Sequence, residues 1–468
     1  MAIQFGTDGW RGIISDDYTF SNVRLVAAAI ADYVLDRKEA QKGLVIGYDA
    51  RFLSRQYAET CAAVVQSMGV KVWLSDRILP TPALTWQVRD RSAAGGIVIT
   101  ASHNPPEYNG LKFKASFGGS ASPEMMAALQ KYVDQREAAG IPVPQPAPGA
   151  AVELFSPQAA YLDHVRAMLD ANVLKTMRGK IVFDCMHGSG MGYCAELAKT
   201  YGLDLVELRG TVNPSFGGIS PEPIMKNLGA LREFVLAEKP RVALATDGDA
   251  DRIGALDEQG RFINAHQIMA LLIKYLVEKR GWSGGVVQTL TVSELVRRVA
   301  GKYGLKLYEM PVGFKHVTQL MLSEDILIGG EEAGGIGLKN YIPERDGILL
   351  GFLLIEVVAA YGKTLGALLA EMMAELGYFY YDRIDLHLSP EQKERLVAAL
   401  ATTPPVELDG LKVLSVKQGD GCKLTLPDGW VIFRASGTEP IVRIYSEAND
   451  QELLKEILRK AEHYAKQA

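Results

Sequence analysis

The stretch GGIVITASHNPPEYNGLK, residues 95–112, runs from a short apolar strand directly into a polar loop. Residues 97–99 form a continuous run of β-branched side chains, which is typical of a strand buried on both faces of a parallel sheet. The loop after them offers the hydroxyl of Ser102 and the imidazole of His103, and two prolines stiffen it by fixing φ. An ordinary strand followed by a proline-rich turn is the alternative. Because ligands of open α/β sheets bind at the carboxyl ends of the strands, the stretch predicts an α/β fold with a ligand site at Ser102.

The order of strand, loop, helix, glycine and strand occurs three times, beginning near residues 42, 178 and 283. Each such unit buries its strands beneath a returning helix, so three copies predict three related α/β domains, and their irregular spacing argues against a solenoid. After a long apolar helix expected near residues 349–376, strands are predicted at 378–386, 411–416, 422–426 and 430–434. Helices are predicted at 390–402 and 451–465, so the last part of the chain indicates a separate α+β domain.

Alternating prolines at residues 139–149 favour an extended chain and mark the clearest domain boundary. A second boundary follows the strand expected at residues 241–245 and the loop after it. We therefore expect α/β domains at residues 1–145, 146–257 and 258–376, followed by the α+β domain at residues 377–468.

The composition is that of a globular protein. The chain has 468 residues, a hydrophobic fraction of 48% and a charged fraction of 22%, which disfavours disordered and fibrous classes. Its net charge of −5 gives no electrostatic reason to expect a nucleic acid partner. The four cysteines are too few for a disulfide framework, and neither a secretory signal nor a membrane span is visible. We expect a cytoplasmic enzyme without a membrane partner, and the sequence gives no indication of its oligomeric state.

An acidic loop, Asp247-Gly-Asp-Ala-Asp-Arg252, places three carboxylates at alternate positions, as a hard divalent cation requires. A solvated acidic turn and a dehalogenase-type loop with an aspartate nucleophile are alternatives. An EF-hand is another, because Glu258 stands at the twelfth position of such a loop. The sixth position, however, is Arg252 instead of glycine, and the flanking residues read as strands. The loop therefore predicts a metal site made by Asp247, Asp249 and Asp251.

Three further segments carry polar groups at glycine-rich turns. Residues 5–12 place Arg11 among three glycines, and residues 329–335 frame Glu331 with glycines, so that the backbone can approach a ligand closely. Residues 311–316 supply Lys315, which is equally well interpreted as a solvated residue at a helix start. Each of these segments taken alone is also compatible with a surface turn.

The segment from Arg434 to Arg443 lies between two predicted strands and is dense in donors. It combines two guanidinium groups, the hydroxyls of Ser436 and Thr438, and the flexible Gly437. Bidentate arginine donors and a concave array of amides suit a phosphate dianion. A hairpin with a Ser-Gly turn is the alternative.

Taken in order, these motifs resemble those of the α-D-phosphohexomutases, the family of phosphoglucomutases and phosphomannomutases. The match spans the whole chain, and residues 213–223 also look like a stretch found in that family. The resemblance implies three related α/β domains with mixed sheets and a C-terminal TATA-binding-protein-like α+β domain, arranged around one central cleft.

The resemblance also implies roles for individual residues. Ser102 would carry the transferable phosphoryl group and, with Asp247, Asp249 and Asp251, would hold Mg²⁺. Lys112 and Arg11 match positions of proton transfer or charge stabilisation, and His103 is grouped with them as catalytic. The residues expected to bind substrate are Arg252 beside the metal loop, Lys315, Glu331 at the sugar hydroxyls, and Arg434, Ser436, Gly437, Thr438 and Arg443 at the phosphate.

The implied reaction interconverts a hexose 1-phosphate and a hexose 6-phosphate through phospho-Ser102 and a 1,6-bisphosphate. Glucose phosphates are favoured, with glucose 1,6-bisphosphate as intermediate and activator, because the Gly-Glu-Glu start of the sugar loop resembles phosphoglucomutases. Ala333 stands where many members have serine, and Gly335 where some have histidine. A phosphomannomutase, an enzyme with both specificities and a phosphoglucosamine mutase are therefore alternatives. A metal-dependent sugar phosphatase and an inactive sugar-phosphate binding protein are the alternatives from other classes.

Overall fold

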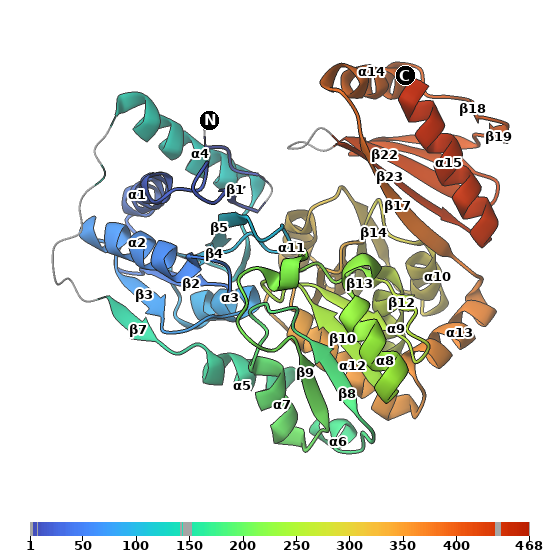
Figure 1. Cartoon of the computed structure of the whole chain (residues 1–468), viewed down its shortest axis with the longest axis horizontal. Helices are drawn as coiled ribbons and strands as arrows, with labels where there is room; N and C mark the ends of the chain where they lie inside the picture. Colours follow the sequence, from blue (N-terminus) through green and yellow to red (C-terminus); the bar gives the residue numbers. More distant parts are fainter. Residues whose placement is uncertain (1–2, 7, 141–142, 144–151, 436–440, 468) are drawn as a thin grey trace.

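The structure is a computed structural model that describes residues 3–6, 8–140, 143, 152–435 and 441–467. Four domains follow one another in an arc, with the first and fourth at its two ends (Figure 1). Three of them are α/β domains with mixed sheets and the fourth is an α+β domain, which confirms the predicted fold class. The expected boundary between residues 145 and 146 lies outside the described residues. Strand β7 (Glu153–Phe155) nevertheless pairs with β3 of the first sheet, and β12 (Phe262–Ile263) pairs with β11 of the second, so both domains extend beyond their predicted ends at residues 145 and 257.

The first domain contains a seven-stranded sheet in the order β1-β5-β4-β2-β3-β7, with β6 paired to β5. Odd and even residues of its central strand contact different cores: Ile97 and Ile99 pack beneath α1, α2 and α4, whereas Val98 packs with α3. The elements are β1 (Trp10–Ile13), α1 (Phe20–Asp36), β2 (Leu44–Tyr48), α2 (Ser54–Ser67), β3 (Val72–Ser75), α3 (Thr81–Asp90), β4 (Gly95–Ile99), β5 (Tyr108–Ala115), β6 (Gly119–Ser120), α4 (Pro123–Ala139) and β7 (Glu153–Phe155).

The second domain has a five-stranded sheet in the order β12-β11-β10-β8-β9, and the third a four-stranded sheet in the order β14-β13-β15-β16. The second domain comprises α5 (Gln158–Met168), α6 (Ala171–Leu174), β8 (Ile181–Asp184), α7 (Tyr193–Tyr201), β9 (Leu205–Leu208), two short 3₁₀ turns (Phe216–Gly218 and Met225–Asn227), α8 (Gly229–Glu238), β10 (Val242–Thr246), β11 (Ile253–Leu256) and β12 (Phe262–Ile263). The third comprises α9 (Ala265–Glu278), β13 (Gly285–Thr289), α10 (Glu294–Lys302), β14 (Leu307–Met310), α11 (Phe314–Ser323), β15 (Ile326–Gly330), β16 (Ile336–Leu338), α12 (Gly347–Tyr361) and α13 (Leu365–Leu376).

The three α/β domains share one arrangement of strands. Each has three parallel strands, β3-β2-β4, β9-β8-β10 and β14-β13-β15. In each, the last of these strands also pairs antiparallel with the next strand in the chain, β5, β11 or β16. The loop at this antiparallel step therefore occupies the same topological position in every domain. These loops are the Ser102 loop, the Asp247 loop and the Glu331 loop.

The long helix expected at residues 349–376 is wrong, because α12 and α13 are two helices bent by 76°. The backbone of Gly362 has φ 66° and ends α12, and the side chain of Thr364 caps the first turn of α13. Among the described residues no single helix is long and apolar enough to cross a membrane. The bent pair α12 and α13 reaches the length and apolar composition of a membrane span only when its two helices are taken together.

The fourth domain has a five-stranded antiparallel sheet in the order β17-β23-β22-β21-β20. Its elements are β17 (Tyr380–His387), α14 (Pro390–Thr402), β18 (Glu407–Leu408), β19 (Leu411–Lys412), β20 (Ser415–Gly419), β21 (Gly421–Leu426), β22 (Gly429–Ala435), β23 (Ile441–Ala448) and α15 (Gln451–Gln467). The single strand predicted at residues 411–416 is therefore two strands in different sheets, β19 and β20. Helix α14 begins and ends where the sequence predicts.

His266 is buried where the third and fourth domains meet. Its ring lies 4.4 Å from the ring of Tyr381, and its Nδ1 accepts a hydrogen bond from the backbone N–H of Ser293 at 3.4 Å. Burial lowers the pKa of His266 to about 3. Because an unfolded histidine titrates at about 6.5, the folded state binds fewer protons below that pH. Stability therefore falls as the pH decreases from 7 to 5.

A His266→Gln variant is expected to lose about 2 kcal/mol less stability than the wild type between pH 7 and pH 5. Urea unfolding at the two pH values measures this difference. The exposed His463 provides the control, because His463→Gln should lose as much stability as the wild type. Equal losses in His266→Gln and the wild type would contradict the prediction.

Candidate active site

Ser102 lies at the tip of the β4–β5 loop, where its side chain meets the second domain. Its backbone is in the left-handed region with φ 53°, and its N–H donates to Oγ1 of Thr100 at 2.8 Å. The residue is 1% exposed, and its Oγ donates a hydrogen bond to Oδ2 of Asp247 at 2.9 Å. The absence of a side chain at Gly248 permits this approach, since a Cβ there would lie 2.4 Å from the backbone oxygen of Ser102.

Arg51, which the sequence analysis missed, organises the Ser102 loop from inside. Its two terminal nitrogens donate to the backbone oxygens of Ser102 (2.7 Å), Asn104 (2.6 Å), Pro105 (2.8 Å) and Tyr108 (3.0 Å). A salt bridge of 3.3 Å to Asp49 balances its buried charge. The ring of Phe216, from the second domain, lies 4.9 Å from the guanidinium carbon. The pattern Asp49-x-Arg51 directly after strand β2 is the signal that could have identified it.

Asp247, Asp249 and Asp251 form a buried group whose ligand oxygens lie within 4.8 Å of one another. Burial and the charges of Asp249 and Asp251 raise the pKa of Asp247. Oδ1 of Asp249 and Oδ1 of Asp251 are buried without a hydrogen-bond partner among the described residues. Buried carboxylate oxygens without donors suit a hard divalent cation such as Mg²⁺. The loop connects strands β10 and β11 instead of two helices, so the EF-hand alternative is wrong.

Lys112, on strand β5, places its ammonium group against this acidic loop. Its Nζ lies 2.8 Å from Oδ2 of Asp249, 3.3 Å from Oδ2 of Asp251 and 3.2 Å from Oδ2 of Asp8. Burial opposes the charge of Lys112, but these three carboxylates raise its pKa, so the side chain stays protonated. Two residues along the strand, Lys114 is also buried and contacts Asp8 at 3.2 Å. Asp8 lies in the glycine-rich loop predicted at residues 5–12, but no role was predicted for Asp8 or Lys114.

Arg11 and His103 both lie at the loop that carries Ser102. Arg11 extends from β1, and its Nη1 donates to Oδ1 of Asn104 in the same loop. Burial, together with the positive charges of Arg252 and Arg11, lowers the pKa of His103 well below its ordinary value. The ring is therefore neutral at pH 7, and its Nδ1 is a buried atom with no hydrogen-bond partner among the described residues. Arg252 lies at the end of the acidic loop, 3.9 Å from both Asp247 and Asp251.

The third loop brings Glu331 to the same region. Its Oε1 accepts a hydrogen bond from the backbone N–H of Gly313 at 2.8 Å, and its Oε2 lies 3.8 Å from Arg345. The backbone of this loop also reaches the second domain, because the N–H of Ile253 donates to the oxygen of Gly334 at 3.1 Å. Arg345 is a further residue of this region that the sequence analysis missed.

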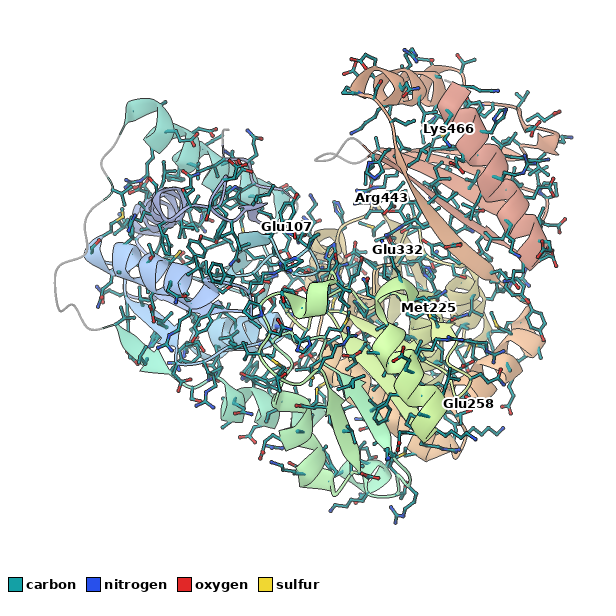
Figure 2. All side chains as sticks on the ribbon, viewed as in Figure 1. Glu107, Met225, Glu258, Glu332, Arg443 and Lys466 are labelled. Carbon is teal, nitrogen blue, oxygen red and sulfur yellow. The ribbon has the colours of Figure 1, made fainter. Side chains whose placement is uncertain are left out.

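The expected phosphate-binding arginines lie in the fourth domain. Arg434 on β22 and Arg443 on β23 are directly opposite in the antiparallel register, so their side chains share one face of the sheet. Arg434 donates to Oδ1 of Asp420 at 3.0 Å, and Oδ2 of Asp420 accepts from the N–H of Val312 at 2.9 Å. Figure 2 shows Arg443 on the side of this domain that faces Glu332 of the third.

Four predicted substrate-binding residues have no part in the contacts described so far. Lys315 lies in the first turn of α11. Ser436, Gly437 and Thr438 lie outside the described residues.

Binding of Mg²⁺ to the acidic loop is expected to stabilise the protein by about 2 to 3 kcal/mol at a concentration of about 100 times the dissociation constant. An Asp249→Asn variant should lose most of this increment, because one buried carboxylate ligand is replaced by a neutral amide. Thermal unfolding with EDTA and with MgCl₂ at matched ionic strength measures it. The exposed Asp204 gives the control, and Asp204→Asn should retain the full increment. An equal increment in Asp249→Asn would rule out this loop as the site.

Comparison with known proteins covers all four domains. Family models described as phosphoglucomutase/phosphomannomutase match the chain: alpha/beta/alpha domain I at residues 2–139, domain II at 159–260, domain III at 264–376 and the C-terminal domain at 391–462.

Three individual proteins show the extent of the similarity. A phosphoglucomutase/phosphomannomutase of Thermococcus kodakarensis is 31% identical and is aligned over 98% of this chain and 97% of its own. A phosphoglucosamine mutase of Carboxydothermus hydrogenoformans is 29% identical, with 98% of each chain aligned. A solved structure from Thermus thermophilus, provisionally named a phosphomannomutase, superposes with a TM-score of 0.88 and 36% identity, over 100% of this chain and 99% of that one.

Proposed function

Since this chain belongs to the α-D-phosphohexomutase family of phosphoglucomutases and phosphomannomutases and is a phosphohexomutase, we propose that it interconverts glucose 1-phosphate and glucose 6-phosphate. One observation is the main support for the proposed site. Ser102 and Lys112 of the first domain both donate hydrogen bonds to the Asp247 loop of the second, Ser102 to Asp247 and Lys112 to Asp249. A hydroxyl, a cation and three carboxylates in one buried place suit phosphoryl transfer through a serine phosphate.

In the proposed cycle the phosphoryl group begins on Oγ of Ser102. The free 6-hydroxyl of glucose 1-phosphate attacks the phosphorus, a new O–P bond forms, and the Oγ–P bond breaks to give glucose 1,6-bisphosphate. Lys112 and Arg11 stabilise the negative charge, because Lys112 contacts Asp249 of the acidic loop and Arg11 contacts Asn104 of the serine loop. The hydroxyl proton passes to His103, whose ring is neutral and whose Nδ1 has no hydrogen-bond partner in the part of the chain that the structure describes. The bisphosphate then turns around, and Oγ of Ser102 attacks the phosphorus of its 1-phosphate. The O1–P bond breaks, and the proton held by His103 passes to O1 to give glucose 6-phosphate.

Asp247, Asp249 and Asp251, together with the serine phosphate, are the groups that would hold Mg²⁺. When bound, the ion supplies positive charge that neutralises phosphoryl oxygens. Arg252, 3.9 Å from Asp247 and Asp251, binds the substrate beside this loop. Glu331 receives hydrogen bonds from the sugar hydroxyls, and the segment from Arg434 to Arg443 grips the phosphate that is not reacting.

Glucose is preferred over mannose and glucosamine in this proposal because of the sugar loop. Its Gly-Glu-Glu start resembles phosphoglucomutases, although Ala333 removes a hydroxyl that many family members have there. The similar proteins carry several names, including phosphoglucosamine mutase, so the sugar has to be determined directly.

A panel of glucose, mannose and glucosamine 1-phosphates tests the proposal, each with Mg²⁺ and its 1,6-bisphosphate. Hexose 6-phosphate and free phosphate are measured in the same tube. We expect 6-phosphate without free phosphate and the highest kcat/KM for glucose. A higher value for another sugar would overturn the substrate assignment. Release of free phosphate alone would indicate a phosphatase, and neither product would indicate a binding protein.

A further inference from the structure

Arg345, immediately before α12, contacts carboxylates from several separate parts of the chain. Its Nη2 lies 2.7 Å from Oδ2 of Asp251 and 3.2 Å from Oδ2 of Asp8. Its Nη1 lies 3.8 Å from Oε2 of Glu331, and its Nε lies 3.4 Å from Oε1 of Glu344. The side chain is only 8% exposed, so its partners are these carboxylates and not solvent.

Two of these carboxylates belong to loops with different tasks. Asp251 is part of the acidic loop of the second domain, and Glu331 belongs to the sugar loop of the third. A guanidinium group is planar and rigid, so Arg345, which contacts Asp251 at 2.7 Å and forms an ion pair with Glu331 at 3.8 Å, restricts the separation of these two carboxylates. The N–H of Gly313 holds the other oxygen of Glu331 at 2.8 Å, which leaves this carboxylate little freedom.

Gly335 leaves the space through which the stem of Arg345 passes. A Cβ at Gly335 would lie 2.3 Å from Cδ of Arg345 and 3.1 Å from its Cγ. The φ angle of Gly335 is not in the left-handed region, so its backbone conformation does not itself require glycine. A side chain at this position would displace Arg345 from its partners. The position where some family members have histidine is thus occupied here by the stem of an arginine from another segment.

We infer that Arg345 is a positioning residue that fixes the Glu331 carboxylate relative to the Asp247 loop, and that Gly335 is needed because it makes room for Arg345. This inference rests on the proposed function, in which Glu331 binds the sugar hydroxyls. A fixed Glu331 holds the sugar so that its accepting hydroxyl stands at a constant distance from Ser102. A displacement of about 1 Å in such a geometry can lower the rate by about 100-fold.

A double-mutant cycle tests the inference, with the variants Gly335→Ala, Arg345→Ala and both together. Each single variant is expected to lower kcat/KM for glucose 1-phosphate by at least about tenfold, whereas the double variant should lie within about twofold of Arg345→Ala. The two effects should not add, because a Cβ at residue 335 no longer collides with the Arg345 side chain once that side chain has been removed.

A second readout separates positioning from loss of structure. Glucose 1,6-bisphosphate with labelled phosphoryl groups transfers its label to Ser102 only in correctly folded sites. The fraction of protein that becomes labelled therefore gives the concentration of competent sites, by which kcat is calculated. Among these sites we expect kcat to fall and KM for glucose 1-phosphate to rise in Arg345→Lys, which keeps the charge and loses the planar fork. A merely structural role would reduce the labelled fraction and leave KM unchanged. Gly301→Ala and Arg297→Lys, both at exposed or open positions of α10, are the matched controls.

The outcomes distinguish this inference from the proposed function. If the wild type converts hexose 1-phosphates but Gly335→Ala is fully active, or its cost is the same with and without Arg345, only the role of Arg345 is overturned. If the wild type converts none of them, the proposed function fails and the role of Arg345 fails with it. A KM in Arg345→Lys equal to that of the wild type would also overturn the positioning role.

Discussion

Ser102→Ala is expected to lower the turnover of glucose 1-phosphate by about 10⁴-fold or more, because no oxygen remains to carry the phosphoryl group between the two half-reactions. The loss should appear in kcat, and the variant should take no label from glucose 1,6-bisphosphate. The loop itself should persist, because Arg51 holds it through backbone oxygens that the substitution leaves in place.

Steady-state kinetics, labelling and thermal unfolding together check this result. Ser323→Ala, an exposed serine of α11, is the control and should keep full activity. Turnover within tenfold of the wild type in Ser102→Ala would show that the phosphoryl carrier is another residue. A large drop in melting temperature would show that the variant had lost its fold and not its nucleophile.

Lys112→Met is expected to lower the free energy of unfolding by about 3 kcal/mol in metal-free buffer, because it leaves two buried carboxylates, Asp249 and Asp251, and the partly buried Asp8 without a shared cation. Asp249 depends most on Lys112, whose charge and hydrogen bond lower the pKa of that carboxyl against the effect of burial. Asp8 and Asp251 also contact Arg345, so their loss is partly compensated. Turnover should fall by at least about 100-fold, since the charge beside the transferring phosphoryl group is lost.

Magnesium provides the decisive comparison for this variant. Bound Mg²⁺ restores a positive charge beside Asp249 and Asp251, so the stability gap between Lys112→Met and the wild type should narrow in MgCl₂ and widen in EDTA. Lys455→Met, on the exposed face of α15, should show neither effect. A gap that does not depend on Mg²⁺ would mean that Lys112 and the metal act on separate groups.

The sequence was sufficient to predict the individual loops of the site, but not that the Ser102 loop and the Asp247 loop contact each other. Ser102 and the three aspartates could each be recognised from local chemistry, because hydroxyls after an apolar strand and alternating carboxylates in a tight turn are distinctive. Their contact depends on how two domains pack, which no local pattern records. It became visible only with the hydrogen bond from Ser102 to Asp247.

Three buried cationic residues of the site were not predicted from the sequence, because their partners lie far away in the chain. Arg51, Lys114 and Arg345 each lie within two residues of another charged residue, and charged side chains in such segments are usually solvated. Their importance comes from distant partners: Arg51 binds a loop about 50 residues away, and Arg345 contacts Asp8 near the start of the chain. The Asp49-x-Arg51 pattern is a local signal for Arg51, but Lys114 and Arg345 can be predicted only when the fold that brings their partners together is known.

The errors in secondary structure also have local causes. The helix expected at residues 349–376 is divided because Gly362 and Thr364 end one helix and begin the next, and both signals stand inside an otherwise continuous apolar pattern. The strand expected at residues 411–416 is divided between two sheets. Its apolar residues change from odd positions, Leu411 and Val413, to even positions, Leu414 and Val416, at the break.

Strand β7 has a consequence for how the protein is made. It pairs in parallel with β3 at the edge of the first sheet, although it lies beyond α4 in the chain. During synthesis the ribosome must therefore release residues as far as Phe155 before the first sheet can be completed. A fragment that ends at residue 140 would expose the edge of β3, and such open edges promote aggregation. Dissection of this enzyme should accordingly cut after β7, so that the isolated first domain keeps its last strand.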